Sequence, residues 1–392
     1  MRTPDTTSGK AVLTLAHVAG MIDMVALPVW IGALMQHYGD SAPQAGITVT
    51  LFLFGVVLAS LFCAPRFNRW PRRAACAGGF AVAALAFFVA GQQPVAVSSF
   101  QALAALHAVA GLGVGCALSF THGCIGRSAN PHRLFAVVNI TLGVFAVLFL
   151  GGMPQLIARL DASVLFSVIA ATMALAAVVM ALAFPQVPSL AVTDASTTVA
   201  IAPRIPRAAW YAIAVVMCLT LNQAMVFSFV ERIGADRGFG SERVNGVLIA
   251  LGLVNLLPGA LAALLQTKLS PIAVGIAGPI GQAVLALTMS SATNFAPYAV
   301  AASCYVFMVI FTHTFLFGLL SRLDPSGRAV AATPAMMMVG SCIGPALGGA
   351  IVQGLGYPGL GWAACGVAAL AVMATLQVQR QMSKPAPALA PA

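Results

Sequence analysis

The sequence predicts an all-α integral membrane protein, with twelve transmembrane helices arranged as two six-helix bundles. Hydrophobic residues make up 60% of the chain and charged residues only 7%, whereas an average soluble domain has roughly 25% charged residues. Apolar runs of about 20 residues, the length that crosses a bilayer, follow one another along the chain. One long polar stretch in the middle divides these runs into six and six.

The apolar runs are near-continuous in hydrophobicity, and most of them are too long for strands. The first run is longer than the apolar region of a secretory signal, so we expect it to remain in the protein. The predicted helices cover residues 11–35, 46–65, 74–91, 97–120, 134–157, 163–184, 208–230, 244–265, 271–291, 295–320, 329–353 and 360–378.

The longest polar interruption, over residues 185–209, is rich in Pro, Ser and Thr and has the composition of a linker. Two similar bundles that face each other place a binding site near the membrane midplane in many transporters. We therefore expect an N-terminal bundle over 1–184, a cytoplasmic linker over 185–207, a C-terminal bundle over 208–380 and a cytoplasmic tail over 381–392.

The basic residues set the predicted orientation, because loops rich in Lys and Arg stay in the cytoplasm. With the N-terminus inside, fifteen of the nineteen Lys and Arg residues fall in cytoplasmic segments. The outer segments hold only Arg159, Arg232, Arg237 and Arg243. Both termini are then cytoplasmic, and we expect a multi-pass protein of the bacterial inner membrane. The net charge of +10 reflects topology, since no basic soluble domain that could bind nucleic acid is present.

Three local patterns carry a family resemblance that covers essentially the whole chain. The loop after the second helix reads APRFNRWPRR, the fourth helix contains LHAVAGLGVGCA, and the eleventh contains GSCIGPALGG. Together these resemble motifs of the major facilitator superfamily, and the resemblance implies transport by alternating access. Arg69, Arg72 and Arg73 match the basic places of the family's cytoplasmic loop motif. The chain departs from that motif at Ala64, Asn68 and Pro71, where the family usually has Gly, Asp and Gly.

The fourth helix differs from its motif at one informative place. His107 stands where the family has an arginine, while Gly111 and Gly113 match. Arginine is always charged and histidine titrates near neutral pH, so a permanent cation becomes a switchable one. The alternative is a neutral, hydrogen-bonded histidine between helices. The GSCIGPALGG pattern resembles a drug-exporter signature that normally lies in helix 5, and here its small residues predict close helix packing.

Asp23 is the acidic residue that lies deep in an apolar run, within GMIDMVALPVW. A lone charge at the bilayer centre costs at least ~2.5 kcal/mol. No Lys or Arg lies at comparable depth, so we expect protonation, hydration or His107 to compensate the carboxylate. Burial favours the protonated form of a carboxyl group, which is the property that a proton-coupling site needs. We assign proton coupling to Asp23 and His107.

The resemblance implies that helices 1, 4, 7 and 10 line a central cavity, which selects polar residues at mid-membrane depth as substrate contacts. Trp30 shares a helix face with Asp23, and its ring could attract an organic cation. The alternatives are a membrane-interface anchor for Trp30 and interhelical hydrogen bonds for the amides. The candidate substrate-binding residues in these helices are Trp30, Asn222, Gln223 and His313, and the further candidates are Asn255 in helix 8 and Asn139 in helix 5.

The sequence lacks the motifs of several other activities. The sequence contains no nucleotide phosphate loop, no His-Glu-x-x-His, no Gly-x-Ser-x-Gly and no Cys-x-x-Cys pair. We therefore expect no enzymatic activity, no metal and no cofactor, with protons as the coupling ion. The expected partners are a small-molecule substrate and the lipid bilayer, without nucleic acid, and we expect a monomer.

These features predict a secondary active transporter that exports small cationic or neutral amphipathic compounds in exchange for protons. The deep charge is negative at most, which disfavours organic anions. The alternative is proton-coupled uptake of a small organic acid, with protonated His107 and His313 supplying positive charge. A membrane sensor without transport would need a long signalling domain, and the tail is short and rich in Pro and Ala.

Overall fold

The computed structural model describes residues 2–63, 66–67, 69–93, 99–186, 205–324, 329 and 333–383. These residues form helices and no strand, so the all-α prediction is confirmed. The helices of the first half are α1 (Thr7–Gly20), α2 (Asp23–Gln36), α3 (Ala42–Cys63), α4 (Arg72–Gly91), α5 (Phe100–Ile125), α6 (Pro131–Arg159) and α7 (Ser163–Ala183). Those of the second half are α8 (Arg207–Phe227), α9 (Val230–Asp236), α10 (Ser241–Val254), α11 (Pro258–Leu265), α12 (Pro271–Ser291), α13 (Phe295–Leu323) and α15 (Thr333–Met382).

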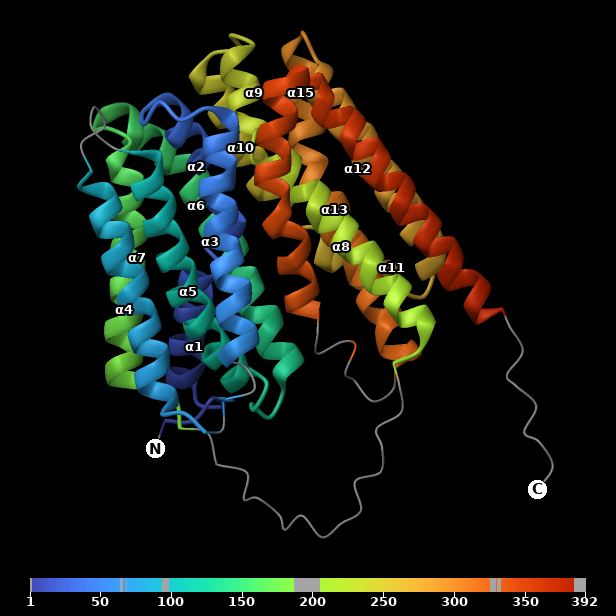
Figure 1. The fold of residues 1–392 in the computed structure, drawn as a ribbon. Coiled ribbons are helices and arrows are strands. Elements are labelled where there is room, and N and C mark those ends of the chain that lie inside the picture. The colour runs from blue at the N-terminus through green and yellow to red at the C-terminus, as the bar shows by residue number, and fades with distance from the viewer. Residues whose placement is uncertain are drawn as a thin grey trace, which may run out of the picture.

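Eleven helical stretches in the described residues are long and apolar enough to cross a membrane, and the last of them turns back on itself. This stretch has 47 residues, which as a straight helix would extend about 70 Å, more than twice the hydrocarbon thickness. Gly356 interrupts it with φ +68°, a conformation that glycine adopts without steric cost. Figure 1 shows the two legs of α15 on either side of the turn. They correspond to the helices predicted over 329–353 and 360–378.

Three predicted helices are not continuous, which corrects the prediction at each place. The run 11–35 divides into α1 and α2 at Met21 and Ile22, directly after Gly20, a weak helix former. The run 244–265 divides into α10 and α11 just before Pro258, because proline has no N–H with which to continue the helix. The seventh helix is also interrupted, between α8 and α9. These breaks fall inside helical stretches that are long and apolar enough to cross a membrane.

The helices pack in two groups, α1–α7 and α8–α15, which touch through α3 with α15, α6 with α10, and α2 with α8 and α9. At the first contact the N–H of Ala346 donates to the hydroxyl of Thr50 over 3.1 Å. At the second, the Asn245 amide donates to the carbonyl of Gly151 over 3.3 Å. Gly349, from the GSCIGPALGG pattern, lies directly against the carbonyl of Ala42, so the predicted close packing is present.

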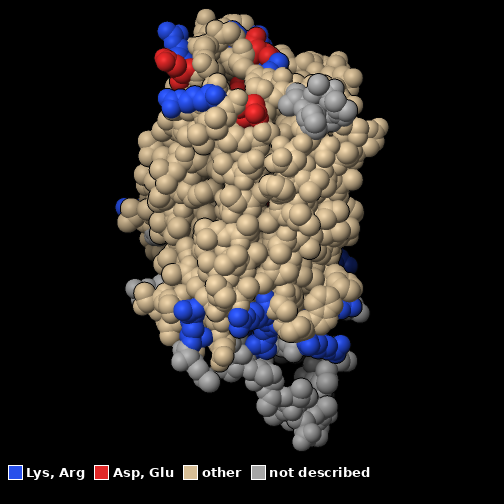
Figure 2. Space-filling view, turned by 90° about the vertical axis from the view of Figure 1, so that its left-hand side faces the viewer, with Lys and Arg blue, Asp and Glu red and all other residues tan. Residues whose placement is uncertain are grey.

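The two ends of the molecule differ in charge. Figure 2 shows Lys and Arg without acidic residues at one end of the visible face, and acidic and basic residues mixed at the other. We call these the basic end and the mixed end. Helix α1 begins and helix α15 ends toward the basic end in Figure 1, and the two helix groups meet at the mixed end and separate toward the basic end. The predicted linker lies outside the described residues over 187–204, and so does the predicted tail from residue 384 onward.

Candidate functional site

Asp23 opens helix α2 at the break in the first transmembrane helix. Its side chain is 1% exposed, so it does not point to the lipid-facing surface. Neither carboxyl oxygen has a hydrogen-bond partner within the described part of the chain. The position in the first turn of a helix of 14 residues gives some electrostatic support, because the N-terminus of a helix carries partial positive charge.

No cation lies within ion-pair distance of Asp23 in the described residues, where the one side-chain ion pair joins Arg232 and Asp236. A buried carboxylate without a partner carries a large desolvation penalty. A proton removes that charge, and loss of the proton would need water or a rearranged site. Asp23 therefore lies where its charged form is costly to bury.

His107 on α5 is fully buried, and both of its ring nitrogens are hydrogen-bonded. Its Nδ1 donates to the carbonyl of Leu103 over 2.6 Å, because a carbonyl oxygen can only accept. Its Nε2 accepts from the indole N–H of Trp30 over 3.0 Å. The two bonds require a neutral imidazole with the proton on Nδ1, which is the hydrogen-bonded alternative considered above. The role of His107 as a switchable cation stays a prediction.

Trp30 lies at the centre of an aromatic cluster that includes His107. The indole ring centroid is 5.2 Å from that of Phe52, 5.4 Å from Phe87 and 6.3 Å from Phe166. The side chain is 0% exposed, so Trp30 can contact neither lipid nor a substrate in this conformation. Asp23 and His107 are not joined by a hydrogen bond, because both nitrogens of His107 have other partners.

The second half of the chain contains a polar network inside its own bundle. The Asn222 amide donates to the carbonyl of Ala364 over 3.1 Å, and the Tyr305 hydroxyl donates to the carbonyl of Asn222 over 2.7 Å. Gln282 donates to the carbonyl of Leu219 and to Tyr305. Asn222 therefore holds helices together in this structure. The sequence analysis missed Tyr305 and Gln282, although each is a polar side chain inside an apolar run.

The remaining candidates in the second half are more open. Gln223 is half-buried and makes no hydrogen bond within the described residues. His313 is half-buried, its ring lies 4.9 Å from that of Phe317, and its Nδ1 is enclosed without a partner. Asn255 ends α10 at the break in the eighth helix, with its side-chain oxygen unpaired. The structure does not join these three side chains to Asp23.

A pair of histidines that the sequence analysis did not identify lies between Asp23 and the basic end. Nδ1 of His17 on α1 and Nε2 of His122 on α5 are 3.1 Å apart, which is a hydrogen bond. Asn139, on α6, approaches His17 and is itself exposed. On an ideal helix His17 is displaced by six residues and about 120° from Asp23, so the sequence offers no reason to pair the two. No local sequence pattern singled out His122.

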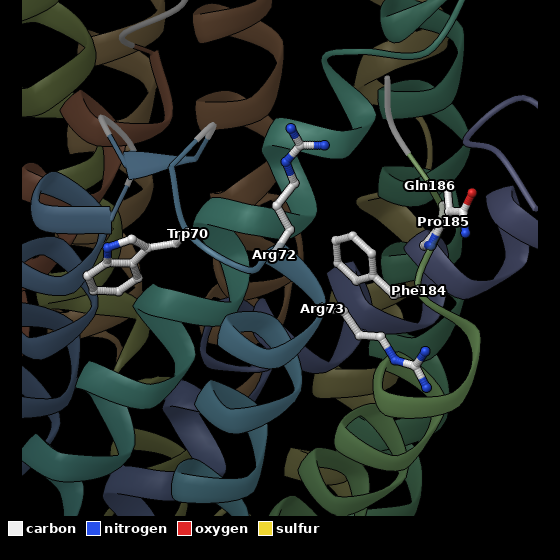
Figure 3. Close-up of a pocket in the computed structure, with 6 residues that line it drawn as sticks. All are labelled: Trp70, Arg72, Arg73, Phe184, Pro185 and Gln186. Carbon is white, nitrogen blue, oxygen red and sulfur yellow. The ribbon is translucent and has the colours of Figure 1, made fainter. Parts of the chain in front are cut away.

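Of the three loop-motif arginines, Arg72 and Arg73 line a pocket of about 370 Å³ at the basic end (Figure 3). Trp70, Arg72, Arg73 and Phe184 are among its lining residues. The Arg72 guanidinium lies 4.8 Å from the centre of the Phe67 ring and donates to the Phe67 carbonyl. In Figure 3 the side chains of Arg72 and Arg73 point in different directions. Arg69 is exposed nearby, and two of the loop positions that depart from the motif, 64 and 68, lie outside the described residues.

Comparison with known proteins shows which family has this architecture. The chain is similar to the solved D-xylose-proton symporter, with 18% identity, a TM-score of 0.71, and coverage of 95% of this chain and 96% of that chain. A variant of the nucleoside transporter NupG gives 13% identity and a TM-score of 0.73 over 95% and 100% of the two chains. A bacterial homologue of the human lysosomal transporter Spinster, inward-facing and unoccupied, gives 14% and 0.66 over 95% and 94%.

These three likenesses concern the fold, and a search among curated proteins finds no match. The sequence itself matches the family model described as Major Facilitator Superfamily over residues 12–333. That match spans both helix groups and includes Asp23, His107 and the cytoplasmic-loop arginines. The chain therefore belongs to the major facilitator superfamily of membrane transporters.

Proposed function

We propose that this transporter moves small cationic or neutral amphipathic compounds out of the cell in exchange for protons, with Asp23 as the proton-binding group. The observation that carries the proposal is the buried, unpaired carboxyl group of Asp23 at the break between α1 and α2. Binding and release of a proton there changes the cost of burying the side chain. The two bundles can then alternate in a way that depends on protonation.

The substrate class follows from the charges at depth. The first helix contains a carboxyl group, and no Lys or Arg lies beside it in the described residues. His107 is neutral where an arginine would be charged, because its two nitrogens bond Leu103 and Trp30. A site of this charge disfavours organic anions relative to cations and neutral molecules. The alternative is proton-coupled uptake of a small organic acid. The transport experiment described below distinguishes uptake from export.

The basic end is assigned to the cytoplasm by the excess of Lys and Arg there. In this orientation both termini are cytoplasmic, the membrane is the inner membrane of a bacterium, and the bundles separate toward the cytoplasm. Protons are the coupling ion and no other cofactor takes part. The transporter acts as a monomer, with its substrate path between the two bundles.

The test is internal pH in dye-loaded proteoliposomes that contain the native protein or Asp23→Asn. A panel of cationic, neutral and anionic organic compounds is added, and the flux of each compound is measured in parallel. Proton movement opposite to the flux of cationic or neutral compounds, lost in Asp23→Asn, supports exchange. Proton movement with anions in the same direction supports the uptake reading. Compound flux without proton movement would remove Asp23 from the mechanism.

A further inference from the structure

His17 and His122 form a hydrogen-bonded imidazole pair that joins α1 to α5. The 3.1 Å bond links Nδ1 of His17 to Nε2 of His122, and the ring centroids are 5.2 Å apart. One of these two nitrogens donates and the other accepts, so a neutral pair has two forms. In one form the free N–H is on Nδ1 of His122, and in the other it is on Nε2 of His17. The two forms differ by the passage of one proton through the pair.

The two outer nitrogens of the pair have different surroundings. Nε2 of His17 is enclosed and meets no described donor or acceptor at hydrogen-bond distance, although the Asn139 amide approaches the ring. His122 is half-buried, and its Nδ1 is neither bonded to a described residue nor enclosed. The ring of Phe135 lies edge-on to His122 at 5.6 Å. One end of the pair is therefore open and the other end points into the protein interior.

The pair lies on the cytoplasmic side of Asp23 in the proposed orientation. His17 precedes Asp23 by six residues in the first transmembrane helix, on the other side of the break at Met21 and Ile22. Asp23 itself is enclosed although the bundles separate toward that side. A carboxyl group that exchanges protons with the cytoplasm needs a route through the protein. The enclosed nitrogen of His17 is at the inner end of such a route.

Among the described side chains, no other ionisable group is hydrogen-bonded or ion-paired to His17 or His122, and the side chains of His132 and Arg133 lie outside that described part. Helix α1 packs on α5, α6 and α7, and α7 contains no ionisable residue. The pair's contact is imidazole to imidazole, with the neutral amide of Asn139 beside it. The other ionisable residues of these four helices are Lys10 on α1, His107, Cys116 and Cys124 on α5, and His132, Arg133 and Arg159 on α6.

We propose that His17 and His122 form a proton relay between the cytoplasmic space and Asp23, an inference that rests on the proposed role of Asp23. A proton binds Nδ1 of His122, the shared proton passes from Nε2 of His122 to Nδ1 of His17, and the proton on Nε2 of His17 leaves toward Asp23. The pair carries the same number of protons before and after the step. Ring rotation or the reverse transfer restores the first form.

Infrared spectroscopy of the full chain in lipid membranes tests this relay without a known substrate. The carbonyl-stretching band of protonated Asp23 is identified by its loss in Asp23→Asn. After transfer to D₂O the band shifts as the carboxyl proton is replaced, and the rate of that shift measures proton exchange between Asp23 and solvent. His17→Gln and His122→Gln keep an amide that can hydrogen-bond but cannot carry a proton at neutral pH.

We expect exchange in both glutamine variants to slow on the order of 100-fold, the lower range for a positioned proton donor or acceptor. Imidazole added to the buffer should restore fast exchange in His122→Ala, because the ring can occupy the space that the side chain leaves. A purely structural pair would not respond to imidazole in this way. His37→Gln, at the end of α2 that is far from the pair, is the matched control and should exchange like the native protein.

Two results overturn the relay, and they can be told apart. Unchanged exchange in both His17→Gln and His122→Gln, with the Asp23 band present, rejects the relay and leaves the proposed function standing. Absence of an Asp23 band at every pH from 5 to 9 rejects both, because neither survives without a protonated Asp23. The amide bands of each variant, compared with those of the native protein, show that the fold is kept.

Discussion

The carboxyl group of Glu231 on α9 lies against Gly32 on α2, in the space that a Cβ atom of residue 32 would occupy. The two residues belong to different bundles, and they meet at the mixed end, where the bundles touch. The Oε2 atom of Glu231 is enclosed there without a hydrogen-bond partner. The Glu231 carboxyl group therefore occupies the space that the absence of a side chain at residue 32 leaves between the bundles.

Gly32→Ala should hold the bundles apart at the mixed end, because the added methyl group overlaps the Glu231 carboxyl group. The distance between spin labels at residues 159 and 242, in a background without native cysteines, should increase. Glu231→Ala in the same chain should restore the native distance, whereas Glu231→Gln, with the same bulk, should not. Gly152→Ala on α6 is the control, since no atom lies within 4 Å of the added Cβ. A native distance in Gly32→Ala alone would contradict this account.

Trp30→Phe should lower stability more than it lowers substrate affinity. The change removes the N–H that bonds Nε2 of His107 and leaves that nitrogen buried and unpaired, at a cost of about 1–3 kcal/mol. The thermal midpoint of unfolding in detergent, followed with a thiol-reactive dye, should fall. Trp362→Phe is the matched control, because Trp362 is 67% exposed. A Trp30→Phe protein of native stability that has lost substrate binding would favour the substrate-contact role predicted from the sequence.

The neighbours Asn222 and Gln223 should respond to alanine substitution in opposite ways. Asn222→Ala removes the hydrogen bond to Ala364 inside the C-terminal bundle and should destabilise the protein by roughly 0.6–2 kcal/mol. Gln223→Ala removes no hydrogen bond to a described residue, so stability should be unchanged while affinity for the transported compound falls. Unfolding midpoints and transport KM values for the two variants, measured side by side, check this. Equal effects on both quantities would show that the two residues share one role.

Asp40 should make stability depend on acid pH. It lies between α2 and α3, and burial raises the pKa of its carboxyl group from 3.8 to about 6. Between pH 4 and pH 6 the folded protein keeps a proton that the unfolded chain releases, so stability falls as pH rises through that window. Asp40→Asn should have the native unfolding midpoint at pH 4 and a higher midpoint than the native protein at pH 7. Parallel pH curves for the two proteins would rule out this contribution of Asp40.

The fold could be predicted from the sequence because hydrophobic length and basic loops follow directly from the physics of the bilayer. The functional site was harder to predict from the sequence than the fold. Asp23 stood out as a deep acid, but the environment of Trp30 depends on rings from α3, α4 and α7 that only the packing brings together. His17 and His122 are separated by 105 positions in the chain, so no local pattern shows their contact. Glu231 lies at a helix end, and its contact with Gly32 of the other bundle is formed only by the packing of the two bundles.

The break between α1 and α2 divides the first transmembrane helix between two anchors. α2 is fastened by the Trp30 to His107 bond and faces α9 of the other bundle. α1 is fastened by the His17 to His122 bond. Met21 and Ile22 separate these two helices, and Asp23 is the first residue of α2. A rotation of either helix would therefore change the environment of the Asp23 carboxyl group, because this residue lies at the break between them.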